Sequence, residues 1–161
     1  RAGRPGAFTI MKGYLNDPEQ TALALRDGWL HTGDLAYCDG EGYLYIADRK
    51  KDMILSGGLN IYSKEVEQAI VDCPGVADAA VVGVPDGTYG EAVAAYVETL
   101  PGAAPTADAI VAHCRELIAS YKKPKYVVFL DELPRNAIGK VLKRELSERA
   151  RRELPLEKEA G

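Results

Sequence analysis

Apolar and polar positions follow two different patterns along the chain, and the change between them falls near residue 50. Before it, short apolar stretches are interrupted by glycine and charge, which predicts short strands at 7–11, 30–32 and 42–47. A tight turn is expected at 39–42 and a short helix at 17–25, with Pro18 in its first turn. This segment is typical of a β-rich fragment that does not bury a core by itself.

Beyond residue 50, apolar runs alternate with stretches in which apolar residues recur at helical spacing. The pattern predicts strands at 52–56, 76–84, 92–98 and 126–130, a helix capped by Ser63, and helices at 107–118 and 140–154. The turn-rich segment 85–90 favours direct pairing of the two central strands. We therefore expect an α+β domain of about 100 residues with a mixed or antiparallel sheet flanked by helices.

The composition is that of an average folded protein. The 161 residues are 47% apolar and 27% charged, enough for one domain, or for a small domain and a piece of another. No apolar run approaches the ~20 residues that span a bilayer, and no signal-peptide pattern is present. Cys38, Cys73 and Cys114 are far apart in sequence, and Cys114 falls on an apolar helix face. These features predict a reduced, cytoplasmic protein without structural zinc and without a membrane span.

The net charge of −4 conceals a basic segment, because residues 115–153 hold 11 Lys or Arg against six Asp or Glu. Such a segment could bind an anion, although a run of Lys and Arg on a helix is more often a solvated face. Nucleic acid is not favoured as a partner, because the basic and aromatic patterns of DNA and RNA readers are missing.

Four short segments carry residues that could do more than pack. Asp34 follows a Thr-Gly pair at a strand end, where its carboxylate could accept hydrogen bonds from vicinal hydroxyls, although a structural turn explains it too. Arg49 lies in a run of five charges that also suits a linker. The pair Gly57 and Gly58 permits close approach of a ligand, or simply a tight turn. Lys140 follows a flexible glycine on a loop, where an ordinary surface lysine is the plain alternative.

In this order and spacing, the segments resemble the adenylate-forming superfamily of acyl-CoA synthetases, peptide-synthetase adenylation domains and firefly luciferase. The resemblance runs from about residue 11 to about residue 148, and it is most specific at 48–62 and 133–143. The segments 83–86, 90–91 and 121–125 fit between these two in register. The segment Gly-Gly-Leu-Asn-Ile-Tyr is most similar to the corresponding segment of fatty acyl-CoA and aryl-CoA ligases.

The resemblance implies a reaction in which a carboxylate and ATP form an acyl-adenylate and pyrophosphate, and coenzyme A then takes the acyl group and releases AMP. By this resemblance Lys140 is the lysine of the first half-reaction, Asp34 binds the ribose and Arg49 also meets the nucleotide. Lys51 falls at the hinge of a mobile domain, and Gly57 and Gly58 line the channel for the pantetheine arm of coenzyme A.

The same resemblance implies that residues 1–50 are the edge of a large AMP-binding domain, 51–155 the mobile C-terminal domain and 156–161 a tail. The phosphate loop, the magnesium-binding segment and the acyl pocket of the family are absent from this sequence. We therefore expect a C-terminal fragment that is inactive alone, whose Mg²⁺ and carboxylic acid are bound by an N-terminal domain. A stand-alone nucleotide-binding or regulatory module is the alternative. A homodimer through exposed strands of the first segment is also expected.

Overall fold

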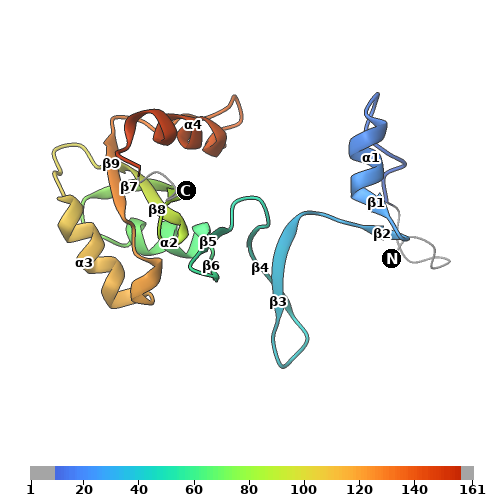
Figure 1. The fold of residues 1–161 in the computed structure, drawn as a ribbon, viewed down its shortest axis with the longest axis horizontal. Coiled ribbons are helices and arrows are strands. Elements are labelled where there is room, and N and C mark those ends of the chain that lie inside the picture. Colours follow the sequence, from blue (N-terminus) through green and yellow to red (C-terminus); the bar gives the residue numbers. More distant parts are fainter. Residues whose placement is uncertain (1–9, 157–161) are drawn as a thin grey trace. The chain divides into compact units, whose positions relative to one another are not determined.

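The computed structural model describes residues 10–156, and the chain divides into two compact units, Arg1–Lys50 and Lys51–Gly161 (Figure 1). Each unit is described by itself. Among residues 10–156, no helix combines the length and the apolar character needed to cross a bilayer.

The first unit contains one short helix and two small antiparallel hairpins. Its elements are α1 (Pro18–Ala24), β1 (Leu25–Arg26), β2 (Trp29–Leu30), β3 (Asp34–Cys38) and β4 (Leu44–Arg49). The helix begins where expected, because the Asp17 side chain accepts a hydrogen bond from the Gln20 backbone N–H and Pro18 follows it. Residues 7–9 of the first predicted strand lie outside the described part, and Ile10 and Met11 are not in a strand.

The β3–β4 hairpin has apolar side chains that its own unit does not cover. Its turn is closed by the Asp39 carboxylate, which accepts hydrogen bonds from the backbone N–H groups of Tyr43 and Glu41; the Tyr43 bond in particular lowers the pKa of Asp39. On the strands, the rings of Tyr37 and Tyr45 stack with centroids 5.2 Å apart. The large apolar residues of this hairpin that are exposed are Tyr37, Tyr43, Leu44, Tyr45 and Ile46. Two short strands with so little burial are marginal in water, which fits a segment that needs covering.

The second unit is a mixed sheet with helices on both faces. Its elements are β5 (Ile54–Ser56), β6 (Leu59–Ile61), α2 (Ser63–Val71), β7 (Val76–Asp86), β8 (Gly90–Thr99), α3 (Ala107–Leu117), a 3₁₀ turn (Ser120–Lys122), β9 (Tyr126–Leu130) and α4 (Lys143–Glu153). Strand β8 is antiparallel to β7 along its length, parallel to β9, and bridged to β5 at Ser56 and Gly90. The expected α+β fold with a mixed sheet is confirmed.

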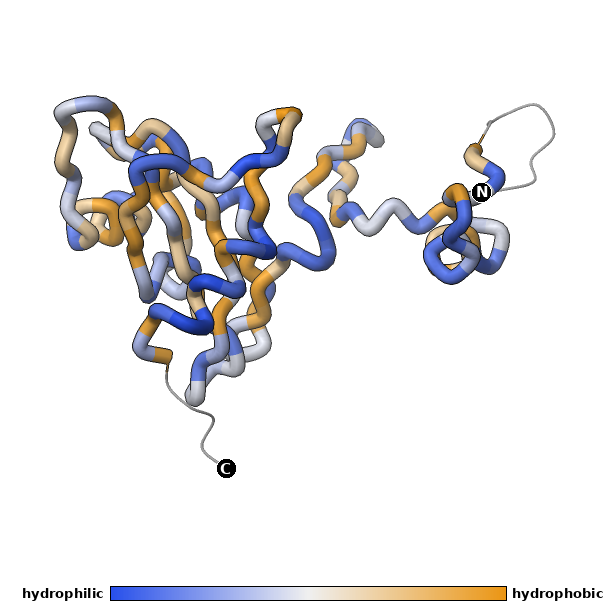
Figure 2. The backbone as a smooth tube through the Cα atoms, turned by 90° about the horizontal axis from the view of Figure 1, so that it is seen from above, coloured by the Kyte–Doolittle hydropathy of each residue, from blue (hydrophilic) through white to orange (hydrophobic). Residues whose placement is uncertain are grey.

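Alternate residues of β7 and β8 point to opposite faces, and both faces are buried. Val81 and Val93 lie in a core cluster with residues of α2 and α3, whereas Val82 and Tyr96 lie in a second cluster with Leu146 of α4. Apolar, orange stretches run through this unit in Figure 2, with polar, blue segments between them. Burial on both faces explains why β7 and β8 read as continuous apolar runs.

Two predicted helix starts are wrong. Ser63 is not the N-cap of α2 but its first residue; Tyr62 occupies the cap without a side-chain hydrogen bond. Helix α4 begins at Lys143 and not at Lys140, because Val141 forms a bridge with Arg135 that keeps the chain extended past Lys140. Lys140 therefore belongs to the loop before the helix. Cys114 is fully buried in the core, as predicted.

Candidate functional site

Lys140 lies at the end of a loop whose backbone is held by the side chain of Asn136. The Asn136 Oδ1 accepts hydrogen bonds from the N–H groups of Lys140, at 2.9 Å, and Ile138, at 3.2 Å, while the Asn136 N–H donates to the Lys140 carbonyl. Gly139, with φ of +80°, makes the turn between them. The backbone at Lys140 is thus fixed although its side chain is exposed.

The base of this loop is anchored on the central strands by Arg135. Its guanidinium pairs with Asp78 of β7, lies 3.9 Å from the Glu98 carboxylate of β8, and donates to the Gly139 carbonyl at 3.1 Å. The Asp78 hydrogen bond also raises the pKa of Arg135. By contrast, the Lys140 ammonium has no hydrogen bond or ion pair with any residue between 10 and 156. The loop therefore presents a free ammonium group from a fixed backbone.

After the loop, Lys143 connects α4 to α2. Its ammonium nitrogen lies 2.7 Å from the Ser63 hydroxyl and 2.7 Å from a Glu67 carboxylate oxygen. This contact joins residues 80 positions apart in the sequence and fixes the first turn of α4, directly after Lys140.

Lys51 and Lys140 line one cavity of about 940 Å³ in the second unit. Its walls include the middle of β7 and the first turns of α4, and the lining side chains with a charge are Lys51, Asp52, Glu91, Lys140, Lys143, Arg144, Glu148 and Arg151. Lys143 and Arg144 have acidic partners at 2.7 and 2.9 Å. The cavity is suited to an anion, because the acidic side chains do not neutralise all of its cations.

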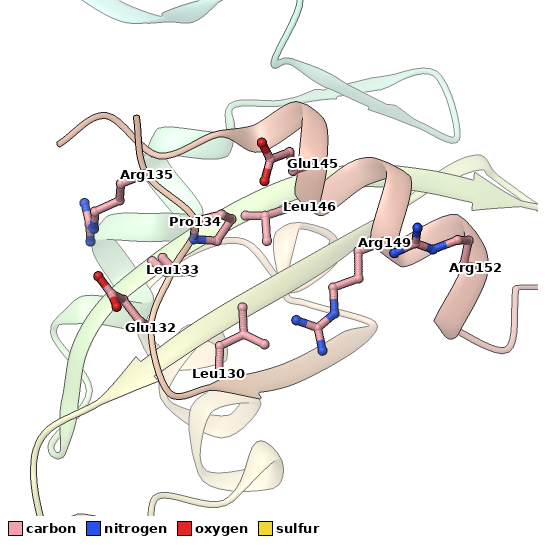
Figure 3. Close-up of a pocket in the computed structure, with 9 residues that line it drawn as sticks. All are labelled: Leu130, Glu132, Leu133, Pro134, Arg135, Glu145, Leu146, Arg149 and Arg152. Carbon is pink, nitrogen blue, oxygen red and sulfur yellow. The ribbon is translucent and has the colours of Figure 1, made fainter. Parts of the chain in front are cut away.

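A second hollow of about 440 Å³ lies between the loop after β9 and α4 (Figure 3). Arg135, Arg149 and Arg152 line it together with Glu132 and Glu145. None of the predicted site residues is among its lining residues.

Gly57 and Gly58 form the turn between β5 and β6, and both are exposed. Their φ angles are +57° and +79°, a region that favours glycine. The Gly57 N–H donates to the Tyr89 carbonyl at 2.8 Å, so the glycine turn is hydrogen-bonded to the segment that connects β7 and β8. The twin glycines therefore present bare backbone to the outside and are not buried in the unit's interior.

Asp34 and Arg49 are brought together in the first unit. They face each other in the β3–β4 register, and the Arg49 Nε lies 2.6 Å from the Asp34 Oδ1. The Asp34 carboxylate is a quarter exposed and the Arg49 side chain about half, at 24% and 52%. This pair offers adjacent acceptor and donor groups to a polar ligand.

Among residues 10–156, no three His, Cys, Asp or Glu side chains come together as a metal site.

Sequence reasoning missed the residues that support the site. Arg135 and Asn136 fall in the stretch 133–143 without a role of their own, and Asp78 lies in an apolar strand where nothing nearby in sequence indicates its pairing. An Asn three residues before Gly139 is a turn signal that could have predicted the fixed loop.

Comparison with known proteins gives one family over much of the second unit. Residues 65–140 match the AMP-binding enzyme C-terminal domain. The chain is 50% identical over 139 residues to a long-chain-fatty-acid–CoA ligase of Bacillus subtilis, covering 86% of this chain and 25% of that protein. It is 48% identical over 137 residues to a 2-succinylbenzoate–CoA ligase of Geobacillus kaustophilus, covering 85% and 28%.

Solved structures agree. ATP-bound MatB from Rhodopseudomonas palustris superposes with a TM-score of 0.79 at 42% identity, covering 86% of this chain and 28% of that one. The amide bond synthetase McbA from Marinactinospora thermotolerans gives 0.77 at 40%, covering 84% and 28%. The chain thus spans about a quarter of the length of the relatives it matches.

Proposed function

We propose that the chain is the C-terminal part of an ATP-dependent acyl-CoA synthetase, because residues 65–140 match the AMP-binding enzyme C-terminal domain. The observation that carries the proposal is the Lys140 ammonium, which has no partner among residues 10–156 and stands on a fixed loop. The chain is also 50% identical over 139 residues to a long-chain-fatty-acid–CoA ligase. In the reaction, a carboxylate and ATP give an acyl-adenylate and pyrophosphate, and coenzyme A then displaces AMP.

Lys140 serves the first half-reaction. Attack of a carboxylate on the α-phosphate brings two anions together, and an ammonium group held beside them stabilises the developing charge. An ammonium already paired with a carboxylate would supply less. The fixed backbone of residues 136–140 supports this role, because it lowers the cost of placing the flexible side chain.

Gly57 and Gly58 serve the second half-reaction. A turn without side chains lets the narrow pantetheine arm of coenzyme A pass close to the backbone. The acceptor is coenzyme A in the CoA ligases named above, whereas McbA is named as an amide bond synthetase. A thiol acceptor is favoured because the relatives of about 50% identity are CoA ligases.

The lysine loop and the glycine turn are anchored at opposite ends of the β7–β8 pair. The lysine loop is anchored at Asp78 and Glu98, whereas the glycine turn contacts Tyr89 and Gly90. Asp78 and Asp86 are eight residues apart on β7, which corresponds to ~26 Å at the usual rise of a strand. The distance between the two anchors supports a mobile domain that presents first one region and then the other, with Lys51 at the hinge.

Asp34 and Arg49 are proposed to contact the ribose and the nucleotide. The remainder of the active centre, including the acyl pocket and the site for Mg²⁺, is assigned to an N-terminal domain that corresponds to the unmatched length of the relatives. The exposed face of β3–β4 is expected to pack against that domain, or in its absence against a second copy of the chain. Light scattering of the chain alone measures whether two copies associate.

The direct experiment is a chimera. Residues 10–156 replace the matching segment of the Bacillus subtilis ligase, and acid-dependent ATP–pyrophosphate exchange and acyl-CoA formation are measured. Activity in both assays supports the proposal, and a folded chimera with neither activity contradicts it. The alternative, a stand-alone nucleotide-binding module, predicts tight binding of ATP or AMP to the isolated chain by calorimetry, whereas half a site should bind both poorly.

A further inference from the structure

Three sequence stretches, 83–86, 90–91 and 121–125, have no chemical role in the proposed function. In the structure they meet at one place, the turn between β7 and β8, directly beside the Gly57–Gly58 turn. Their contacts show how the glycine turn is held.

Asp86 organises the β7–β8 turn from inside. Its side chain is almost fully buried, and one carboxylate oxygen accepts hydrogen bonds from the N–H groups of Thr88, at 3.0 Å, and Tyr89, at 2.9 Å. The other oxygen lies 2.7 Å from the Lys125 ammonium, just before β9. These contacts, with the Lys125 ion pair first among them, lower the pKa of Asp86. The carboxylate is therefore charged at neutral pH and ties the turn to a third segment of the chain.

Tyr89 connects the β7–β8 turn to the Gly57–Gly58 turn. Its carbonyl accepts the Gly57 N–H at 2.8 Å, and its ring lies 3.1 Å from the position a Cβ atom on Gly57 would occupy. Tyr89 thus contacts the glycine turn through both backbone and side chain.

Glu91 holds the strand that leads into the glycine turn. Strand β5 is bridged to β8 only at Ser56 and Gly90, so the neighbouring Leu55 N–H has no ladder partner on that side. A Glu91 carboxylate oxygen accepts this N–H at 2.7 Å, and the other packs over Gly83, 3.1 Å from where its Cβ would be. A side chain here replaces a missing ladder hydrogen bond.

We propose that Asp86 and Glu91 are positioning residues that hold the Gly57–Gly58 turn for the acyl-transfer half-reaction, with Lys125 securing Asp86. The inference rests on the proposed function for its chemical meaning, but the mechanical link can be tested in the chain alone. It accounts for the three sequence stretches by one arrangement, in which a buried carboxylate orders a turn and that turn orders the glycines.

The test measures amide hydrogen exchange of Gly57 and Leu55 in the full chain. Glu91→Gln should speed exchange of the Leu55 amide about tenfold, because it weakens the hydrogen bond that this amide donates to a charged group. Asp86→Asn and Lys125→Met should each speed exchange of the Gly57 amide about tenfold, because they loosen the turn whose Tyr89 carbonyl accepts that amide. Amides in the middle of β8 report that each variant remains folded. Asp78→Asn is the matched control, since it removes an equal charge at the other end of β7, and it should leave both amides unchanged.

The second readout uses the chimera. Glu91→Gln should lower acyl transfer to coenzyme A at least about tenfold more than it lowers pyrophosphate exchange, a ratio that general destabilisation would not change. Unchanged exchange at Gly57 and Leu55 in folded variants overturns the inference and leaves the proposed function intact. Faster exchange with no change in that ratio overturns the role of the glycine turn in transfer, and the inference with it. If Asp86→Asn does not fold, Glu91→Gln alone decides the outcome.

Discussion

Asp34 and Arg49 occupy facing positions on β3 and β4, and the Arg49 Nε lies 2.6 Å from the Asp34 Oδ1. The ion pair orients both side chains in the structure without a ligand. It also leaves the second Asp34 oxygen available as an acceptor, as a ribose site requires.

Replacing Asp34 should therefore weaken nucleotide binding. In the chimera, Asp34→Asn should raise the KM for ATP about tenfold, because an amide accepts hydroxyl hydrogen bonds less strongly than a carboxylate. Asp39→Asn, in the turn of the same hairpin, is the control and should leave KM unaltered. Equal effects of the two substitutions would contradict the assignment of Asp34.

The glycine turn gives a prediction about stability. Gly58→Ala should cost about 1 kcal/mol, because alanine is strained at positive φ while the space around Gly58 is open. Gly57→Ala should cost more, since its new Cβ would also meet the Tyr89 ring. Urea unfolding of the chain checks both. Equal losses for the two variants would show that the ring contact is unimportant.

The stability of the fold should depend on pH through Asp86. Because the Lys125 ammonium holds the pKa of Asp86 below its usual range, the carboxylate stabilises the fold above about pH 4, and this contribution is lost as the pH falls through the folded-state pKa. Lys125→Met removes the main cause, so its stability at pH 7 should be lower and should fall less on acidification. Urea midpoints at pH 7 and pH 3 measure this. Parallel pH profiles for wild type and variant would exclude Asp86 as the source.

The cysteines should differ sharply in reactivity. Burial raises the pKa of Cys114 to about 11 and also raises that of Cys73, whereas Cys38 is exposed on β3. A thiol reagent at pH 8 should therefore modify Cys38 rapidly and the other two only after denaturation. Rapid modification of three thiols in the folded chain would contradict the core described here.

The sequence predicted β7, β8 and β9 well, because their apolar runs are long and β7 and β8 are buried on both faces, but it missed the three-residue strand β6 after the glycine turn. It placed the start of α4 three residues too early, since nothing local shows that Val141 pairs with Arg135. Serine is typical of a helix cap and therefore predicts Ser63 as the N-cap, but its hydroxyl is instead a partner of Lys143, 80 residues away.

Contacts between residues distant in sequence also limit how much of the site the sequence predicts. Lys140, Gly57 and Gly58 could be singled out because they stand in short, specific motifs. Asp78, Asp86 and Glu91, which support them, could not be given a role, because each acts through a partner distant in sequence, such as Lys125 for Asp86. Their function depends on contacts that exist only in the folded chain.

The most direct test of the account is acid-dependent ATP–pyrophosphate exchange by the chimera with Lys140→Ala. Loss of a group that stabilises transition-state charge should lower the exchange rate by about 10²–10³. Lys123→Ala removes a lysine whose one hydrogen bond within residues 10–156 goes to the Ser120 carbonyl, and it should retain the rate of the parent chimera. If Lys140→Ala exchanges pyrophosphate as fast as Lys123→Ala, the ammonium at the loop's end takes no part in adenylation and the account is wrong.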